Sequence, residues 1–97
     1  ERVVRYACPA DLSAAEAGEM AQLALRAFHA LGCCDSTRVD FRMDGAGRIY
    51  FIEINPLPGL APGYSDYPML AEFNGVSYNA LVLSVLRAGA ARCGVAL

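Results

Sequence analysis

Hydrophobic positions along the chain switch between a helical and a strand-like period. Between residues 14 and 31 the apolar side chains recur at spacings of three and four, which is typical of one face of an α-helix. Ser13 and Glu16 in front of this stretch form the S-x-x-E pattern of a capping box, and Gly32 follows it in a C-terminal capping position. We therefore expect a helix over residues 14–31.

After this helix the hydrophobic period becomes two. Residues 37–42 alternate between polar and apolar side chains, residues 44–47 form a glycine-rich turn, and residues 48–55 are a second, strongly apolar run. Two alternating runs joined by such a turn predict an antiparallel β-hairpin within residues 36–55.

Other segments complete the predicted secondary structure. Residues 2–8 predict a short additional strand that ends at Pro9, and residues 56–65 hold three prolines and two glycines, which predicts an irregular loop. A short helix is expected over residues 67–73, and a second long helix, with an apolar stripe, over residues 77–92.

The hairpin separates polar from apolar side chains. If Asp44 faces Ile49, then Asp40 faces Glu53, and alternation places these two carboxylates on one face with Arg38 and Asn55. The opposite, core face carries Val39, Phe41, Ile52 and Ile54. We expect an α+β fold in which a small antiparallel sheet packs, through this core face, against the two long helices.

The polar face of the hairpin carries the candidate chemistry. Asp40 and Glu53 repel each other when they are directly opposite, and Arg38 can compensate for part of that repulsion. A divalent cation would compensate better, because Asp40, Glu53 and Asn55 offer three hard oxygen ligands, and magnesium completes such a set with water and phosphate oxygens. The alternative is an ordinary surface salt bridge on a solvated strand face. The strongly apolar neighbours of Glu53 argue against that alternative.

Composition and charge exclude several classes of function. The 97 residues suffice for one small domain, and eight basic against ten acidic residues give no basic surface for nucleic acid. No apolar run reaches the roughly 18 residues of a membrane span and no signal peptide is visible, so we expect no membrane partner and a cytoplasmic location. The four cysteines and the single His29 lack zinc-site spacing.

The hairpin motifs match a family signature. Arg38-Val39-Asp40-Phe41, followed by Glu53-Ile54-Asn55-Pro56-Leu57-Pro58-Gly59, resembles the C-terminal signature of the ATP-grasp ligases, most closely the D-alanine–D-alanine ligase branch. The segments Cys8-Pro9-Ala10 and Gly75-Val76-Ser77-Tyr78 also have similar counterparts there, so the resemblance covers most of the chain.

The resemblance implies an enzyme that joins a carboxylate to an amine through an acyl phosphate, with ATP as cosubstrate. It implies two magnesium ions, with manganese as a substitute: Asp40 binds one ion, Glu53 bridges both, and Asn55 binds the second. The partners it implies are ATP and small amino-acid or peptide substrates.

Three further roles come from the same resemblance. Arg38 corresponds to the arginine that lies against the transferred phosphate, and Gly59 to the glycine whose backbone N–H stabilises the developing oxyanion. Ser65 matches the serine that holds the carboxylate of the acceptor amino acid.

The loop after the hairpin departs from the family pattern. Pro56 stands where the family has threonine, the loop from Gly59 to Ser65 is one residue longer, and Asp66 adds a negative charge. With these changes, another amino acid or a small peptide is at least as plausible a substrate as D-alanine. Pointing inward, Asp66 would repel a substrate carboxylate; we expect it to point outward, as a surface charge or as a cap for a helix that starts at Tyr67.

The chain has no lysine and begins without methionine, and the family's ATP-binding lysines lie upstream. We therefore expect residues 1–97 to be the C-terminal catalytic subdomain of a larger chain, to contact that chain's upstream domains, and to be inactive alone; homo-oligomerisation stays open. One alternative is a non-catalytic grasp-type module that binds a nucleotide, a metal or a protein partner, and another is a small structural α+β domain.

Overall fold

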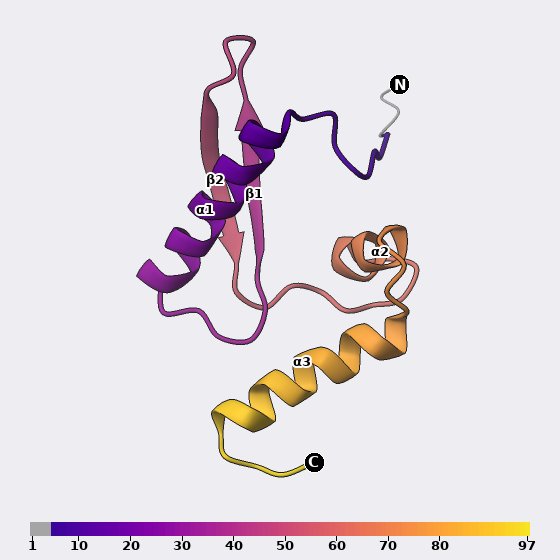
Figure 1. Cartoon of the computed structure of the whole chain (residues 1–97). Coiled ribbons are helices and arrows are strands. Elements are labelled where there is room, and N and C mark those ends of the chain that lie inside the picture. The colour runs from indigo at the N-terminus through magenta and orange to yellow at the C-terminus, as the bar shows by residue number, and fades with distance from the viewer. Residues whose placement is uncertain (1–4) are drawn as a thin grey trace.

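The secondary structure follows the predicted order. The computed structural model describes residues 5–97, with the elements α1 (Ala14–Ala30), β1 (Arg38–Met43), β2 (Ile49–Asn55), α2 (Asp66–Phe73) and α3 (Tyr78–Arg92) (Figure 1). The predicted α+β class is confirmed. The strand predicted over residues 2–8 is wrong for residues 5–8, which are irregular, and its first part lies outside the described residues.

Both long helices begin at serine caps. The Ser13 hydroxyl accepts a hydrogen bond from the backbone N–H of Glu16 at 3.1 Å, and the Glu16 carboxylate accepts one from the Ser13 N–H at 2.9 Å, so the predicted capping box is formed. Gly32 follows α1 with a left-handed φ of 66°, a conformation that glycine adopts without strain. Ser77 caps α3 in the same way, through the Ala80 N–H at 3.1 Å.

The hairpin register agrees with the prediction only at the open end of the hairpin. Asp40 faces Glu53 there, as expected, but a one-residue shift follows Asp40, so that Phe41 faces Phe51 instead of Ile52. Phe51 therefore takes the pairing position that was predicted for Ile52, and both residues are about half exposed, at 49% and 54%. The Phe41 and Phe51 rings meet edge to face with centroids 6.3 Å apart, a contact that the irregular register makes available.

Asp44 stabilises the turn of the hairpin. Its Oδ1 accepts hydrogen bonds from the N–H groups of Ala46 and Arg48 at 3.0 and 2.9 Å, and its Oδ2 accepts one from the Tyr50 hydroxyl at 3.2 Å. These donors, the Arg48 N–H foremost, hold the pKa of the Asp44 carboxyl below its usual range.

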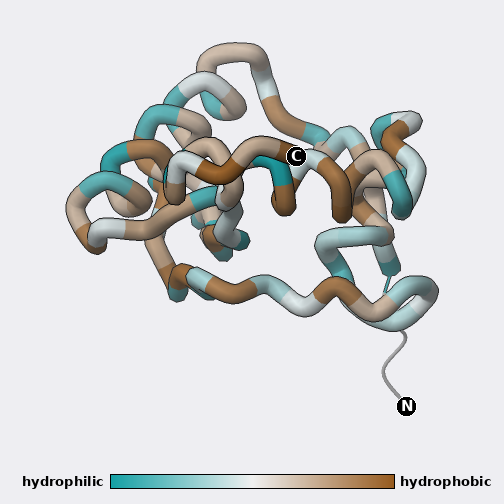
Figure 2. Tube along the Cα trace, turned by 90° about the horizontal axis from the view of Figure 1, so that it is seen from below, coloured by the Kyte–Doolittle hydropathy of each residue, from teal (hydrophilic) through white to brown (hydrophobic). Residues whose placement is uncertain are grey.

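The helices lie in two groups around the hairpin (Figure 1). α1 runs along one side of it and contacts β2, as predicted, whereas α3 packs chiefly against α2 rather than on the sheet. The most buried positions belong to this second group: Pro68 of α2 and Leu81 of α3, which is 6% exposed. Figure 2 shows that hydrophobic residues recur along the whole trace rather than in one central cluster.

No single described helix is long and apolar enough to cross a membrane. α2 and α3 reach the required length and hydropathy only when counted together, and they are bent by 113° at the break between them.

A bidentate ion pair joins α3 to the loop after α1. Arg92 Nε and Nη2 lie 3.2 and 3.0 Å from Asp35 Oδ1 and Oδ2. The hydrogen bonds from Arg92 hold the pKa of the Asp35 carboxyl below its usual range and raise the pKa of Arg92. The pair therefore connects two segments that are distant in the sequence.

This ion pair predicts a specific sensitivity to acid. The pKa of Asp35 is lower in the folded state than the value of about 3.9 in an unfolded chain, so its contribution to stability is complete above that value. The contribution is lost as the pH falls through the folded-state pKa. The Asp35→Asn variant should melt below the parent near neutral pH, and the difference should shrink as the pH falls below the pKa of an unfolded aspartate and through the folded-state pKa.

Melting temperatures of both proteins across this pH range check the prediction. Asp11→Asn, which removes an exposed carboxylate from the segment before α1, is the matched control. A difference between parent and Asp35→Asn that stays constant with pH would contradict the assignment.

Candidate functional site

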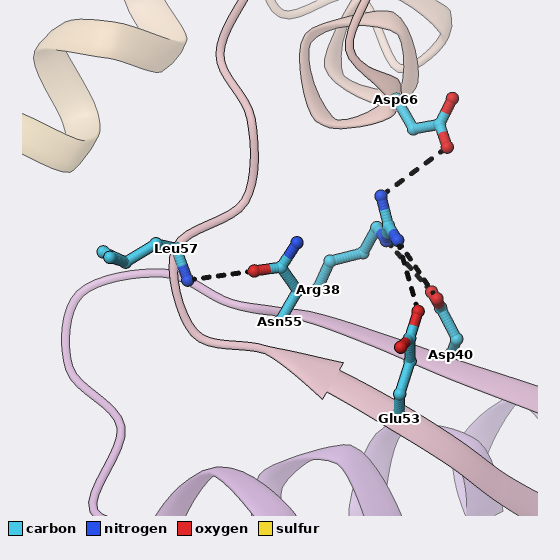
Figure 3. A network of polar contacts seen from close by, with 6 residues as sticks. All are labelled: Arg38, Asp40, Glu53, Asn55, Leu57 and Asp66. Atoms are coloured by element: carbon cyan, nitrogen blue, oxygen red, sulfur yellow. Dashed lines mark hydrogen bonds and ion pairs between the residues drawn. The ribbon is translucent and has the colours of Figure 1, made fainter.

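Four predicted site residues lie together on one face of the hairpin (Figure 3). The register pairs Arg38 with Asn55 and Asp40 with Glu53, so that all four side chains emerge on the same side of the sheet. β1 supplies the arginine and the aspartate, and β2 supplies the glutamate and the asparagine. The two strands thus bring into contact groups that are well separated in the sequence.

Arg38 compensates for the repulsion between the facing carboxylates. Its Nε and Nη2 lie 3.0 and 3.1 Å from the two Asp40 carboxylate oxygens, and Nη2 lies 3.8 Å from Glu53 Oε1. The hydrogen bonds and the negative charge of Asp40 raise the pKa of the Arg38 guanidinium, and the charges of Asp66 and Glu53 raise it to a smaller extent. The guanidinium therefore stays charged.

Asp66 points toward Arg38, contrary to the expectation that it points outward. Its Oδ2 lies 3.6 Å from Arg38 Nη1 (Figure 3). α2 starts at Asp66 itself, with Ser65 at the capping position, so Asp66 is not the cap of a helix that begins at Tyr67. A carboxylate in the first turn is favoured by the partial positive charge of a helix N-terminus, and here it also meets a guanidinium. Sequence reasoning could not show that α2 would lie beside the hairpin.

The loop between β2 and α2 folds back so that Gly59 lies against Ser65. A Cβ at Gly59 would lie 2.6 Å from Ser65 Oγ, and that oxygen accepts a hydrogen bond from the Ala61 N–H at 3.1 Å. Both residues line a cavity of about 290 Å³ together with Arg38, Tyr64 and Asp66. The predicted residues Arg38, Gly59 and Ser65 thus line one cavity. Tyr64 and Asp66, which were not predicted as site residues, line the same cavity.

The hairpin face also has the donor chemistry of a magnesium site. The Asp40 and Glu53 side chains are 35% and 62% exposed, and Asn55 Oδ1 accepts a hydrogen bond from the Leu57 N–H at 3.2 Å, which orients the amide. Two carboxylates and an amide oxygen are ligands that magnesium accepts. No cluster of three or more His, Cys, Asp or Glu side chains arranged to hold a metal occurs within residues 5–97, so the amide and outside oxygens are needed to complete the set.

Comparisons with known proteins identify relatives over most of the chain. The family model described as "D-ala D-ala ligase C-terminus" matches residues 1–87. A D-alanine–D-alanine ligase of Burkholderia vietnamiensis is 44% identical over 82 residues, which is 84% of this chain and 26% of that protein. A D-alanine–D-alanine ligase of Bordetella petrii is 42% identical over 88 residues, 91% of this chain and 27% of the relative.

A third relative, D-alanine–D-alanine ligase B of Chromobacterium violaceum, is 44% identical over 81 residues, 84% of this chain and 26% of that protein. The chain therefore spans about a quarter of the length of these curated relatives.

The contact between Gly59 and Ser65 predicts a coupled pair of substitutions. In Gly59→Ala the new methyl group forces the Ser65 hydroxyl to rotate away and lose its bond to the Ala61 N–H, which should lower the free energy of unfolding by about 1 kcal/mol. In a Ser65→Ala background the Ser65 hydroxyl is absent, so Gly59→Ala should lower the free energy of unfolding by less than it does in the parent.

Urea denaturation of the two single variants and the double variant measures this coupling. Gly45→Ala is the control, because a Cβ at Gly45 meets no atom within 4 Å. Equal costs of Gly59→Ala in both backgrounds would show that the predicted clash does not exist.

Proposed function

Since this chain belongs to the family of D-alanine–D-alanine ligase C-terminal domains, we propose that it supplies the magnesium and ATP-phosphate site of an ATP-dependent carboxylate–amine ligase. The observation that carries the proposal is the gathering of Arg38, Asp40, Glu53 and Asn55 on one hairpin face, beside the cavity that Gly59 and Ser65 line.

Asp40, Glu53 and Asn55 would hold the magnesium ions, or manganese as a substitute. When bound there, the ions neutralise charge on the phosphate oxygens of ATP. The Asn55 amide oxygen accepts a hydrogen bond from the Leu57 N–H and points away from Asp40 and Glu53 (Figure 3), so the amide would have to turn toward the carboxylates to bind the ion. Asp40 must exchange part of its contact with Arg38 for the ion.

Arg38 and Gly59 act on the reacting groups. Arg38 lines the cavity and places a permanent positive charge against the transferred phosphate. The Gly59 N–H donates to the oxyanion that develops at the acyl carbon, at a position where a side chain would collide with Ser65. Neither residue exchanges a proton; both stabilise charge.

Ser65 recognises the acceptor. Its oxygen already accepts a hydrogen bond from the Ala61 N–H, so its own hydrogen is left to donate to the substrate carboxylate. The names of the relatives make D-alanine the first acceptor to test. Because the loop is longer and Asp66 points inward, other small amino acids and dipeptides should be tested as acceptors beside it.

The proposed reaction has two balanced steps. A substrate carboxylate oxygen attacks the γ-phosphorus of ATP, the bond to the β-phosphate oxygen breaks, and ADP leaves. The amine then attacks the acyl phosphate, inorganic phosphate leaves with the bonding electron pair, and the amine loses a proton as the amide forms. The products are the amide, ADP and phosphate.

The chain acts as part of a longer protein in this proposal. Leu57 and Tyr64 are each 86% exposed beside the site, apolar surface that another part of a larger ligase would cover. The chain holds no lysine, so lysine contacts to ATP would come from the upstream domains, and residues 1–97 alone are expected to be inactive. A cytoplasmic location follows from the use of ATP. Nothing on the hairpin face favours the alternative of a non-catalytic binding module.

Glu53→Gln tests the metal assignment. The change removes a charge without removing volume, so amino-acid-dependent ADP release by the complete protein should fall at least about a hundredfold while the circular dichroism spectrum stays the same. Glu19→Gln, which removes an exposed carboxylate from α1, should leave the rate unchanged. Near-parent activity of Glu53→Gln would refute the assignment.

Ser65→Ala tests the acceptor site. The loss of one hydrogen bond to a carboxylate should raise the KM of the amine substrate by about tenfold, while the KM of ATP changes little. Steady-state kinetics with each substrate varied in turn measures both values. If both KM values equal those of the parent, Ser65 does not bind the acceptor.

A further inference from the structure

Arg38 is held by carboxylates from two separate parts of the fold (Figure 3). Its Nε and Nη2 contact Asp40 and Glu53, which belong to the hairpin, whereas Nη1 contacts Asp66, the first residue of α2. The hairpin carboxylates and Asp66 therefore use different nitrogens of the guanidinium. Arg38 can lose its hairpin partners without losing Asp66.

The charges around Arg38 are not balanced within the chain. One positive charge against the three negative charges of Asp40, Glu53 and Asp66 leaves a formal charge of −2. One divalent cation would bring this group to zero. The cation and the guanidinium compete for the same hairpin carboxylates, because both are attracted to them and repel each other.

We infer that Asp66 is a positioning residue, which keeps Arg38 in the cavity when a metal ion engages Asp40 and Glu53. The inference rests on the proposed function, because it takes these two carboxylates as metal ligands. With one divalent ion bound and no ATP present, Asp66 and Arg38 form one neutral pair, and the hairpin carboxylates with the ion form another neutral group.

The position of Asp66 suits this task. Arg38 and Asp66 both line the 290 Å³ cavity with Gly59 and Ser65, so a guanidinium held by Asp66 stays where the substrate phosphate is expected. Ser65 directly precedes Asp66 in the chain, so the same contact also fixes the start of α2 next to the acceptor site. Without Asp66, Arg38 keeps only its hairpin partners and obstructs the ion.

Binding of Mn²⁺ alone to the complete protein tests the inference without any catalytic turnover. The free ion is measured by its electron paramagnetic resonance signal. Asp66→Asn should weaken Mn²⁺ binding about two- to fivefold, the range expected for a partly exposed ion pair, and Asp66→Glu should restore part of the loss. Glu72→Gln removes a carboxylate from the same helix beside a different cavity, and it should have no effect.

A double variant separates positioning from a simple change of local charge. In Arg38→Gln the competing guanidinium is gone, so Mn²⁺ should bind more tightly than to the parent, and adding Asp66→Asn should then change the affinity little. An equal weakening by Asp66→Asn in both backgrounds would mean that Asp66 acts only through its own charge, and the inference would be wrong. Unchanged affinity of the single Asp66→Asn variant would overturn it as well.

Asp40→Asn distinguishes failure of this inference from failure of the proposed function. If Asp40→Asn weakens Mn²⁺ binding and Asp66→Asn does not, the metal site stands and only the positioning role of Asp66 falls. If Asp40→Asn leaves Mn²⁺ binding unchanged, the metal assignment itself fails, and the role of Asp66 falls with it.

Discussion

The site depends on one unfavourable interaction, the direct opposition of Asp40 and Glu53 across the hairpin. Two like charges at a facing position destabilise a sheet, and a sequence selected for stability alone would avoid them. Arg38 relieves the repulsion from the same face, through two hydrogen bonds to Asp40 and a longer contact to Glu53. The pair is therefore tolerated without a cation, and its remaining charge is what the proposed metal site would use.

The irregular register confines this arrangement to the open end of the hairpin. Up to Asp40 the strands pair so that the charged residues face each other, and beyond it the shift of one residue brings Phe41 to Phe51. The acidic pair and the aromatic pair thus lie on opposite faces in consecutive positions. Such irregularities are common beside functional sites, because they redirect side chains without adding an element.

Local patterns predicted much of the fold, because they depend on residues close in the chain. The capping box before α1, the hairpin and the shared face of Arg38 and Asp40 all follow from spacing alone. The register shift could not be predicted, since it depends on how two phenylalanine rings meet across the strands. The packing of α3 on α2, and not on the sheet, depends equally on distant contacts.

The candidate site shows the same division. Arg38, Asp40, Glu53 and Asn55 could be grouped from the alternation of two paired strands, whereas the inward direction of Asp66 depends on where α2 lies in space. Gly59 and Ser65 were predicted as site residues from the family resemblance. The contact between them could not be predicted, because it depends on how the loop folds back.

Charge, more than core packing, holds the site together. Only Pro68 and Leu81 are buried among the residues that the structure describes, and they lie on α2 and α3 rather than on the hairpin. β1 and β2 are joined by their antiparallel pairing, and the ion pair of Arg38 with Asp66 connects them to α2. Exposed ion pairs of this kind each contribute little to stability in water. A site built this way can exchange partners at small cost. These contacts leave a formal charge of −2, which suits the proposed binding of a divalent cation.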